Sequence, residues 1–189
     1  MLSVVIATDE SERALVPTLV ALVPGATAGL VREVIVADAG SRDATAEVAD
    51  IAGCRLLVAK SSTGARLNAA AASARGSWLL FLRPGVVPAP AWIGEVARFI
   101  ENEGGRDHAA RFRIGTRSAA RHSHLREVLA ALRAVLGAHD AARGLLIPKQ
   151  LYDWLGGHRD IGQSEVDLLR RLGRRRLVTL GCSVSVNQS

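Results

Sequence analysis

The chain has 189 residues and a formal net charge of +6, from 24 Lys and Arg side chains against 18 Asp and Glu side chains. A hydrophobic fraction of 49% is too high for a disordered chain, and 18 glycines with 6 prolines are too few for a fibrous protein. The whole charge surplus lies after residue 100, since residues 1–100 carry nine basic and nine acidic side chains. A uniform nucleic-acid-binding coat is therefore excluded, whereas a local site for an anionic group fits this distribution.

Continuous apolar runs in the first hundred residues predict strands that are buried on both faces, at residues 2–7, 33–37, 54–59 and 78–82. Apolar residues at helical spacing predict the helices between them, around residues 15–22, 46–51 and 64–75. This alternation predicts an α/β fold, with a Rossmann-like, mostly parallel sheet and helices on both faces. The length fits one domain, and we expect residues 1–189 to form it.

The second half is less regular. We predict strands at residues 109–114, 144–147 and 177–180 and helices at residues 151–155 and 165–172. An apolar stripe from Leu125 to Leu136 predicts a helix that covers the sheet, and a membrane-facing or partner-facing helix is the alternative. Trp92 and Trp154 are interpreted as core or sheet-covering residues rather than a platform for a sugar.

Cys54 and Cys182 are too few for a disulfide framework and lack the spacing of a zinc site. The apolar run at residues 2–7 lacks the basic lead-in of a signal peptide. No stretch reaches the roughly 18 uninterrupted apolar residues that a membrane-spanning helix needs. We expect a cytoplasmic protein, and peripheral contact with a membrane surface stays open.

Ligands of such sheets bind outside the carboxyl ends of the strands. The turn after the first strand, residues 8–12, has three carboxylates and no glycine, which excludes a dinucleotide-binding Rossmann domain and an S-adenosylmethionine fold. Asp38 ends the second strand, where a carboxylate accepts hydrogen bonds from a base N–H or from ribose hydroxyls. A turn aspartate is the plain alternative for Asp38.

Several segments carry a family resemblance in their order and spacing: residues 3–8, 32–45, 64–71, 74–82, 155–160 and 165–172. In these segments the chain resembles family 2 glycosyltransferases of the GT-A fold. The resemblance covers nearly the whole chain and is weakest between about residues 100 and 140. It implies a nucleotide-binding half at residues 1–100 and an acceptor-side half at residues 101–189.

The resemblance also implies a nucleotide-diphosphate-sugar donor. It places Thr8 and Asp38 near the base and ribose, and Gly64, Arg66 and Asn68 close to the base and diphosphate. Glu165 falls where the family usually has its catalytic base, which deprotonates the acceptor hydroxyl. A first-turn acid that favours the helix dipole is the plain alternative for Glu165.

One departure from the family pattern bears directly on the chemistry. After the fourth strand the family carries an Asp-x-Asp motif or a close variant, which holds a divalent cation (Mg²⁺ or Mn²⁺) on the donor diphosphate. This chain has Arg83-Pro84-Gly85-Val86 there, with no oxygen ligand for a hard cation. In one interpretation Arg83 replaces the cation by pairing with the phosphates, and sugar transfer is independent of metal. The acceptor is unknown, and a lipid-linked acceptor stays open.

In the other interpretation the domain is catalytically inactive and binds a nucleotide sugar, a lipid phosphate or a protein.

His158 and Asp160 lie upstream of Glu165 in the sequence and suggest a cation site. We interpret these residues instead as part of a solvated turn, and we predict no metal ligand. The run at residues 174–176 is interpreted as an exposed, basic helix end.

Overall fold

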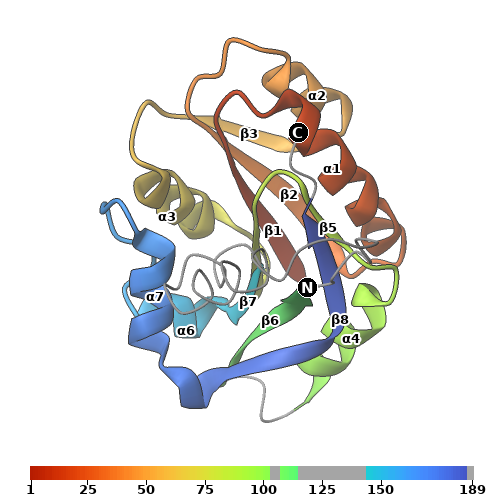
Figure 1. Ribbon diagram of the computed structural model, residues 1–189, viewed down its shortest axis with the longest axis vertical. Helices are drawn as coiled ribbons and strands as arrows, with labels where there is room; N and C mark the ends of the chain where they lie inside the picture. Colours follow the sequence, from red (N-terminus) through yellow and green to blue (C-terminus); the bar gives the residue numbers. More distant parts are fainter. Residues whose placement is uncertain (103–106, 115–143, 187–189) are drawn as a thin grey trace, which may run out of the picture.

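The computed structural model describes residues 1–102, 107–114 and 144–186. Strands and helices alternate through the first half, and Figure 1 shows the sheet running through the middle of the molecule. In chain order the elements are β1 (Leu2–Thr8), α1 (Glu12–Thr27), β2 (Val31–Asp38), α2 (Thr45–Ile51), β3 (Arg55–Val58), α3 (Thr63–Ser73), β4 (Trp78–Leu82), β5 (Val86–Pro88), α4 (Trp92–Glu101), β6 (Ala109–Ile114), β7 (Leu145–Pro148), α6 (Lys149–Trp154), α7 (Ser164–Leu172), the 3₁₀ helix η3 (Arg174–Arg176) and β8 (Leu177–Val186).

The strands form one sheet in the order β3-β2-β1-β4-β7-β6-β8-β5. The strands β1 to β4 pair in parallel, as the alternation of elements predicts. β7 runs antiparallel to both β4 and β6, and β8 runs parallel to β6 and antiparallel to the short β5. The α/β fold with a mostly parallel sheet is therefore confirmed for β1 to β4, and strands of mixed direction extend the sheet on one side.

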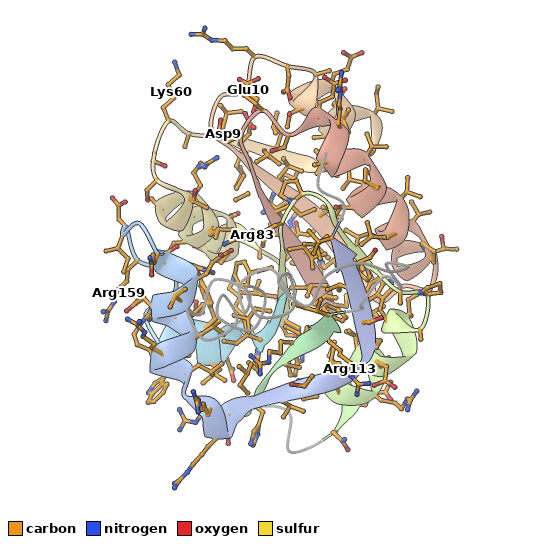
Figure 2. The ribbon with its side chains drawn as sticks, viewed as in Figure 1. Asp9, Glu10, Lys60, Arg83, Arg113 and Arg159 are labelled. Carbon is orange, nitrogen blue, oxygen red and sulfur yellow. The ribbon has the colours of Figure 1, made fainter. Side chains whose placement is uncertain are left out.

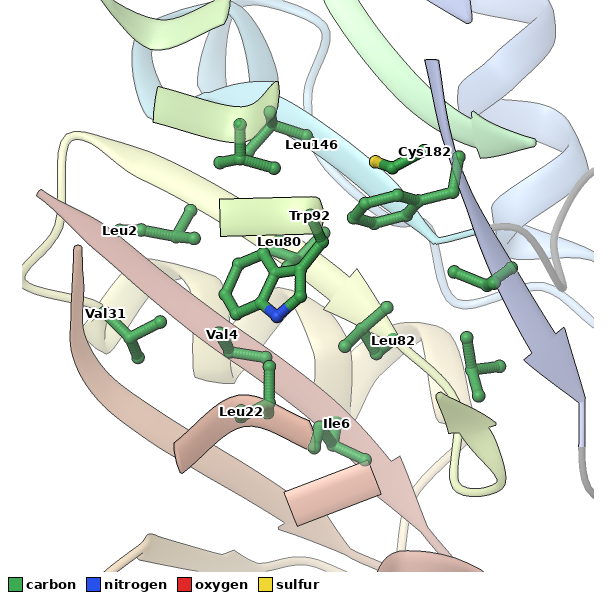
Figure 3. Packing of buried hydrophobic residues seen from close by; sticks show 14 of the residues in the cluster. Leu2, Val4, Ile6, Leu22, Val31, Leu80, Leu82, Trp92, Leu146 and Cys182 are labelled. Atoms are coloured by element: carbon green, nitrogen blue, oxygen red, sulfur yellow. The ribbon is translucent and has the colours of Figure 1, made fainter. Parts of the chain in front are cut away.

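One face of the sheet packs against α1 and α4. Leu2, Val4 and Ile6 of β1 point to this face, because alternate residues of a strand lie on opposite sides. Trp92 fills the space between them and α1 (Figure 3), and its indole contacts the backbone of α1 so closely that a Cβ at Gly25 would lie 2.6 Å from the ring. Trp92 is thus a core residue, as predicted.

The other face packs against α3, α6 and α7. Val5 of β1 and Phe81 of β4 lie in this second cluster, with Leu67 from α3, Tyr152 from α6 and Leu168 from α7. These three helices lie on one side of the sheet in Figure 1, opposite α1 and α2. They carry Gly64, Arg66, Asn68 and Glu165 from distant parts of the chain onto the same face.

Two expectations need correction. Trp154 is 70% exposed, and the guanidinium of Arg176 lies over its ring, 5.0 Å from the ring centroid, so Trp154 is no core residue. The helix predicted to run to residue 75 ends at Ser73, before an extended Ala74. The stripe from Leu125 to Leu136 lies outside the described residues. No helix in the described part of the chain is long and apolar enough to cross a membrane.

Candidate active site

The carboxyl ends of β1, β2 and β4 bring the predicted donor-site residues together at one edge of the sheet. Thr8 and Asp38 are direct partners in the register of β1 and β2. Both side chains are buried, and the Thr8 hydroxyl donates to Asp38 Oδ1 over 2.7 Å. Arg83 follows β4, the neighbour of β1 on its other side. In Figure 2 Arg83 lies well inside the molecular outline, below the loop that carries Asp9 and Glu10.

Asp38 organises the turn that follows β2. Its carboxylate accepts hydrogen bonds from the backbone N–H groups of Gly40 (2.8 Å) and Ser41 (2.7 Å) and from the Ser41 hydroxyl (2.6 Å), besides the bond from Thr8. Burial alone would raise the pKa of Asp38, but these hydrogen bonds hold it below its ordinary value. The carboxylate is therefore ionised and fixed in position, and its contact with a nucleotide stays a prediction.

The acidic turn after β1 is tied to the same segment. Glu10 accepts hydrogen bonds from the backbone N–H groups of Arg42 (2.8 Å) and Asp43 (3.2 Å), and Asp43 accepts one from the N–H of Glu12 (3.0 Å). Glu10 has a φ of 46°, which directs its carboxylate across to that loop. These carboxylates thus join two loops to each other at the edge of the site.

Arg66 lies beneath this edge rather than at its surface. The side chain is 6% exposed, and its Nη1 donates to the backbone carbonyls of Thr8 (2.5 Å) and Ala37 (3.2 Å). Its Nη2 donates to the Thr63 hydroxyl over 3.2 Å. Arg66 therefore holds the ends of β1 and β2 against α3, and a contact between Arg66 and a diphosphate stays a prediction.

Gly64 and Asn68 face the acceptor-side segment. A Cβ at Gly64 would overlap the carbonyl oxygen of Arg159 and lie 2.8 Å from Ser164 Cβ, so only glycine lets α3 approach this loop. One turn later, Asn68 Oδ1 lies 2.5 Å from the position of a Cβ at Gly157. The two residues position the loop that leads into α7.

Arg83 and Glu165 form an ion pair at the end of β4, although 82 residues separate them in the sequence. Arg83 Nε donates to Glu165 Oε1 over 3.2 Å, and Arg83 Nη2 donates to Glu165 Oε2. The side chains are 50% and 20% exposed, respectively. Glu165 also lines a small hollow with His158, Arg111 and Leu169. The residue predicted to replace the metal is thus bound to the predicted base.

His158 is buried in the described structure, with 3% of its surface exposed, so the solvated-turn interpretation is wrong for this residue. Its Nδ1 lies 2.9 Å from the Tyr152 hydroxyl, and its ring packs edge-on against Phe81. The Tyr152 hydroxyl also accepts a hydrogen bond from the His158 N–H over 2.9 Å. Burial lowers the pKa of His158 to about 4, so the imidazole is neutral at pH 7.

Arg171, which the sequence analysis did not single out, fixes the segment before α7. Its Nη1 donates to the carbonyl of Leu155, its Nη2 donates to the carbonyl of Gly157 over 2.6 Å, and it pairs with Asp167 at 2.7 Å. Gly157 has a φ of 60°, which directs its carbonyl to this guanidinium without a Cβ penalty. The two adjacent glycines at residues 156–157 were the one sequence signal for this tight segment.

A comparison with protein families matches residues 3–146 of the chain to the model described as "Glycosyl transferase family 2". Among the curated proteins no relative matches. The match begins in β1 and ends in β7, so it contains the strand ends that carry Thr8, Asp38 and Arg83. Glu165 lies beyond it.

Solved structures share the fold. Glucosyl-3-phosphoglycerate synthase from Mycobacterium tuberculosis, in complex with Mn²⁺, uridine diphosphate and glucosyl-3-phosphoglycerate, is 23% identical with a TM-score of 0.70. The similarity covers 100% of this chain and 72% of that chain, and the same values hold for its complex with Mn²⁺ and UDP-glucose. A structure described as a mycobacterial protein is 23% identical, with a TM-score of 0.68 and 100% and 68% of the two chains covered.

The cation in those complexes prompts the question whether this chain's residues fit one. At the end of β4 the first side chain is the cationic Arg83, and the nearby carboxylate of Glu165 is already paired with it. Within residues 1–102, 107–114 and 144–186 no group of three or more His, Cys, Asp or Glu side chains is placed to hold a metal ion. A divalent cation at this strand end therefore does not fit the described residues.

Proposed function

The chain belongs to glycosyl transferase family 2, and from this membership we propose that it transfers a sugar from a nucleotide-diphosphate sugar to an acceptor hydroxyl. The observation that carries the proposal is the presence of two polar pairs, Thr8 with Asp38 and Arg83 with Glu165, at the carboxyl ends of the neighbouring strands β2, β1 and β4. In open α/β sheets that edge is where ligands bind. The two pairs bring polar side chains from separate segments to this edge, which supports a ligand site there.

In this proposal Asp38 and Thr8 contact the nucleoside, and Arg83 contacts the diphosphate. Glu165 accepts the proton of the acceptor hydroxyl, whose oxygen forms a bond to the anomeric carbon as the bond to the diphosphate oxygen breaks. The nucleoside diphosphate leaves with the electron pair of that bond. The guanidinium of Arg83 offsets the negative charge that develops on the leaving group. We propose that this replaces the family's cation, and that the Asp-x-Asp motif is degenerate.

Substrates are suggested by the structures of similar fold. The synthase from M. tuberculosis was crystallised with UDP-glucose and with phosphoglyceric acid. We propose a UDP-sugar as the first donor to test, and a small anionic molecule such as 3-phosphoglycerate as the first acceptor. The basic Arg111, which lines the hollow beside Glu165, supports a negatively charged acceptor. We propose a cytoplasmic location, where such soluble substrates are available.

Donor binding is tested by thermal unfolding with a panel of UDP-, GDP-, TDP- and ADP-sugars, each with EDTA and with Mn²⁺. A ligand at about 100 times its Kd stabilises the native state by about 2.7 kcal/mol, which raises the Tm of a chain of this size by about 5–10 °C. We expect such a shift for one nucleotide class in EDTA. No shift with any member of the panel, in either condition, contradicts the proposal.

Turnover is tested separately, by release of the nucleoside diphosphate with and without 3-phosphoglycerate.

A second candidate function is a binding module that holds a nucleotide sugar without transferring it. The pairing of both Glu165 oxygens with Arg83 favours this candidate, because a paired carboxylate is less available as a base. If the donor raises the Tm but no acceptor tested gives turnover, the result supports the binding module. Turnover that Glu165→Gln abolishes supports the transferase.

A further inference from the structure

In the described structure the side chain of Arg83 pairs with Glu165, the proposed catalytic base. Both oxygens of Glu165 accept hydrogen bonds from the guanidinium of Arg83. A carboxylate bound in this bidentate way has both oxygens occupied and is oriented toward the cation, not toward a third group. While it is paired with Arg83, Glu165 is therefore not free to act as a base.

Two other guanidinium groups close to the site are already committed. Arg66 is buried on the backbone carbonyls of β1 and β2, and Arg171 is fixed on Asp167 and on the loop before α7. Arg159 is 58% exposed and lies 3.9 Å from Asp167, but it belongs to the loop before α7 and not to a strand end. Arg83 is half exposed and directly follows a strand end, so its side chain has room to turn from one anion to another.

We propose that the donor diphosphate takes Arg83 from Glu165, so that the base becomes free only once the donor is bound. The inference rests on the proposed function, since it requires a nucleotide diphosphate at the carboxyl edge of the sheet. A diphosphate carries more negative charge than one carboxylate and offers a guanidinium the same planar, bidentate geometry. It therefore competes successfully for Arg83.

The exchange has a consequence for the order of events. The freed carboxylate of Glu165 borders the hollow that His158 and Arg111 also line. An acceptor hydroxyl in that hollow then meets an unpaired base, and its proton moves to Glu165 as its oxygen attacks the anomeric carbon. Donor binds first, and the base is unavailable until it has done so. Arg83 is a diphosphate-binding residue that also controls Glu165.

Calorimetric titration with UDP in EDTA tests the exchange without any need for turnover. In the wild-type protein UDP must displace Glu165 from Arg83, whereas in Glu165→Gln that competition is gone. Solvent-accessible ion pairs contribute up to about 1 kcal/mol, which corresponds to about a fivefold change in an equilibrium constant. We expect Glu165→Gln to lower the Kd for UDP by about two- to fivefold, and Arg83→Ala to raise it.

Two controls make the result specific. Asp160→Asn removes the same charge from the neighbouring loop, where Asp160 is exposed, and we expect a smaller change in the Kd. In an Arg83→Ala background, Glu165→Gln should no longer tighten UDP binding by more than Asp160→Asn does. Circular dichroism confirms that each variant is folded.

The outcomes separate the two proposals. If the wild-type protein binds UDP but Glu165→Gln leaves the Kd unchanged or raises it, the exchange is refuted and the proposed function stands. The exchange is refuted in the same way if Glu165→Gln tightens binding equally with and without Arg83. If neither UDP nor any other nucleoside diphosphate binds the wild-type protein, both proposals fall.

Discussion

Gly64 is the position where one added carbon should disturb the candidate site most. In Gly64→Ala the new Cβ would overlap the carbonyl oxygen of Arg159 and lie 2.8 Å from Ser164 Cβ. The carbonyl oxygen of Arg159 belongs to the backbone, which cannot rotate away from a new Cβ as the end of a flexible side chain can. The start of α7, with Glu165 in its first turn, must therefore move away from α3.

The size of the effect follows from two opposing contributions. Overpacking costs about 1–3 kcal/mol, and the rigid neighbours at Gly64 favour the upper end of that range. Replacing a glycine inside a helix by alanine stabilises by about 1 kcal/mol. The net loss is about 2 kcal/mol, which corresponds to a fall in Tm of about 4–8 °C for a chain of this size.

Urea unfolding followed by circular dichroism measures the loss, and Gly162→Ala is the matched control. Gly162 lies in the loop that Gly64 contacts, but a Cβ there would meet no atom within 4 Å. We expect Gly162→Ala to change the free energy of unfolding by no more than about 0.5 kcal/mol. If the two variants are equally stable, the close approach of α3 to the loop is not a real constraint.

Three further predictions concern buried or partly buried polar groups. Because burial lowers the pKa of His158 to about 4, the folded protein should lose up to about 3 kcal/mol of stability as the pH falls from about 6.5 to 4, and urea titrations of His158→Asn should show a flatter profile in that window. Asp38→Asn turns an amide toward four hydrogen-bond donors, so it should cost about 1–3 kcal/mol at pH 7. Because the pKa of Asp38 is lowered in the folded protein, the unfolded chain takes up the proton first, so the difference from wild type should shrink below about pH 4; an equal difference at pH 7 and pH 3 would contradict a role for the charge. Arg171→Met should lower the free energy of unfolding by about 1–3 kcal/mol, whereas the exposed Arg170→Met should change it little, and equal losses would mean that the bonds of Arg171 to the loop do not matter.

Much of the fold could be predicted from the sequence, because hydrophobic periodicity is a local property. β4 spans Trp78–Leu82, the same residues as the predicted strand. β1, β2 and β3 agree with their predictions to within two residues at either end, whereas the three-residue β5 was not predicted. Short-range patterns do not specify pairing direction, so the antiparallel pairs of β7 with β4 and β6 came only from the structure.

The candidate site could be predicted only in its outline. Ligands bind where parallel strands end, and this rule pointed to the positions of Thr8, Asp38 and Arg83. The residue types at those positions were visible in the sequence. The burial and the hydrogen-bond partners of each side chain were not visible in the sequence. Arg66, from an alanine-rich helix, is a buried clamp on two strand ends, and His158, in a loop of polar residues and glycines, is buried against Tyr152.

The sequence by itself determined the alternation of strands and helices and showed that a basic residue, Arg83, follows the fourth strand directly. Only the tertiary structure decided what Arg83 touches. Its contact with Glu165 depends on how α7 packs against α3, which Gly64 and the loop at residues 157–163 allow. Contacts between residues that are distant in the chain depend on packing shape and on backbone approach, and neither is encoded in the spacing of residue types.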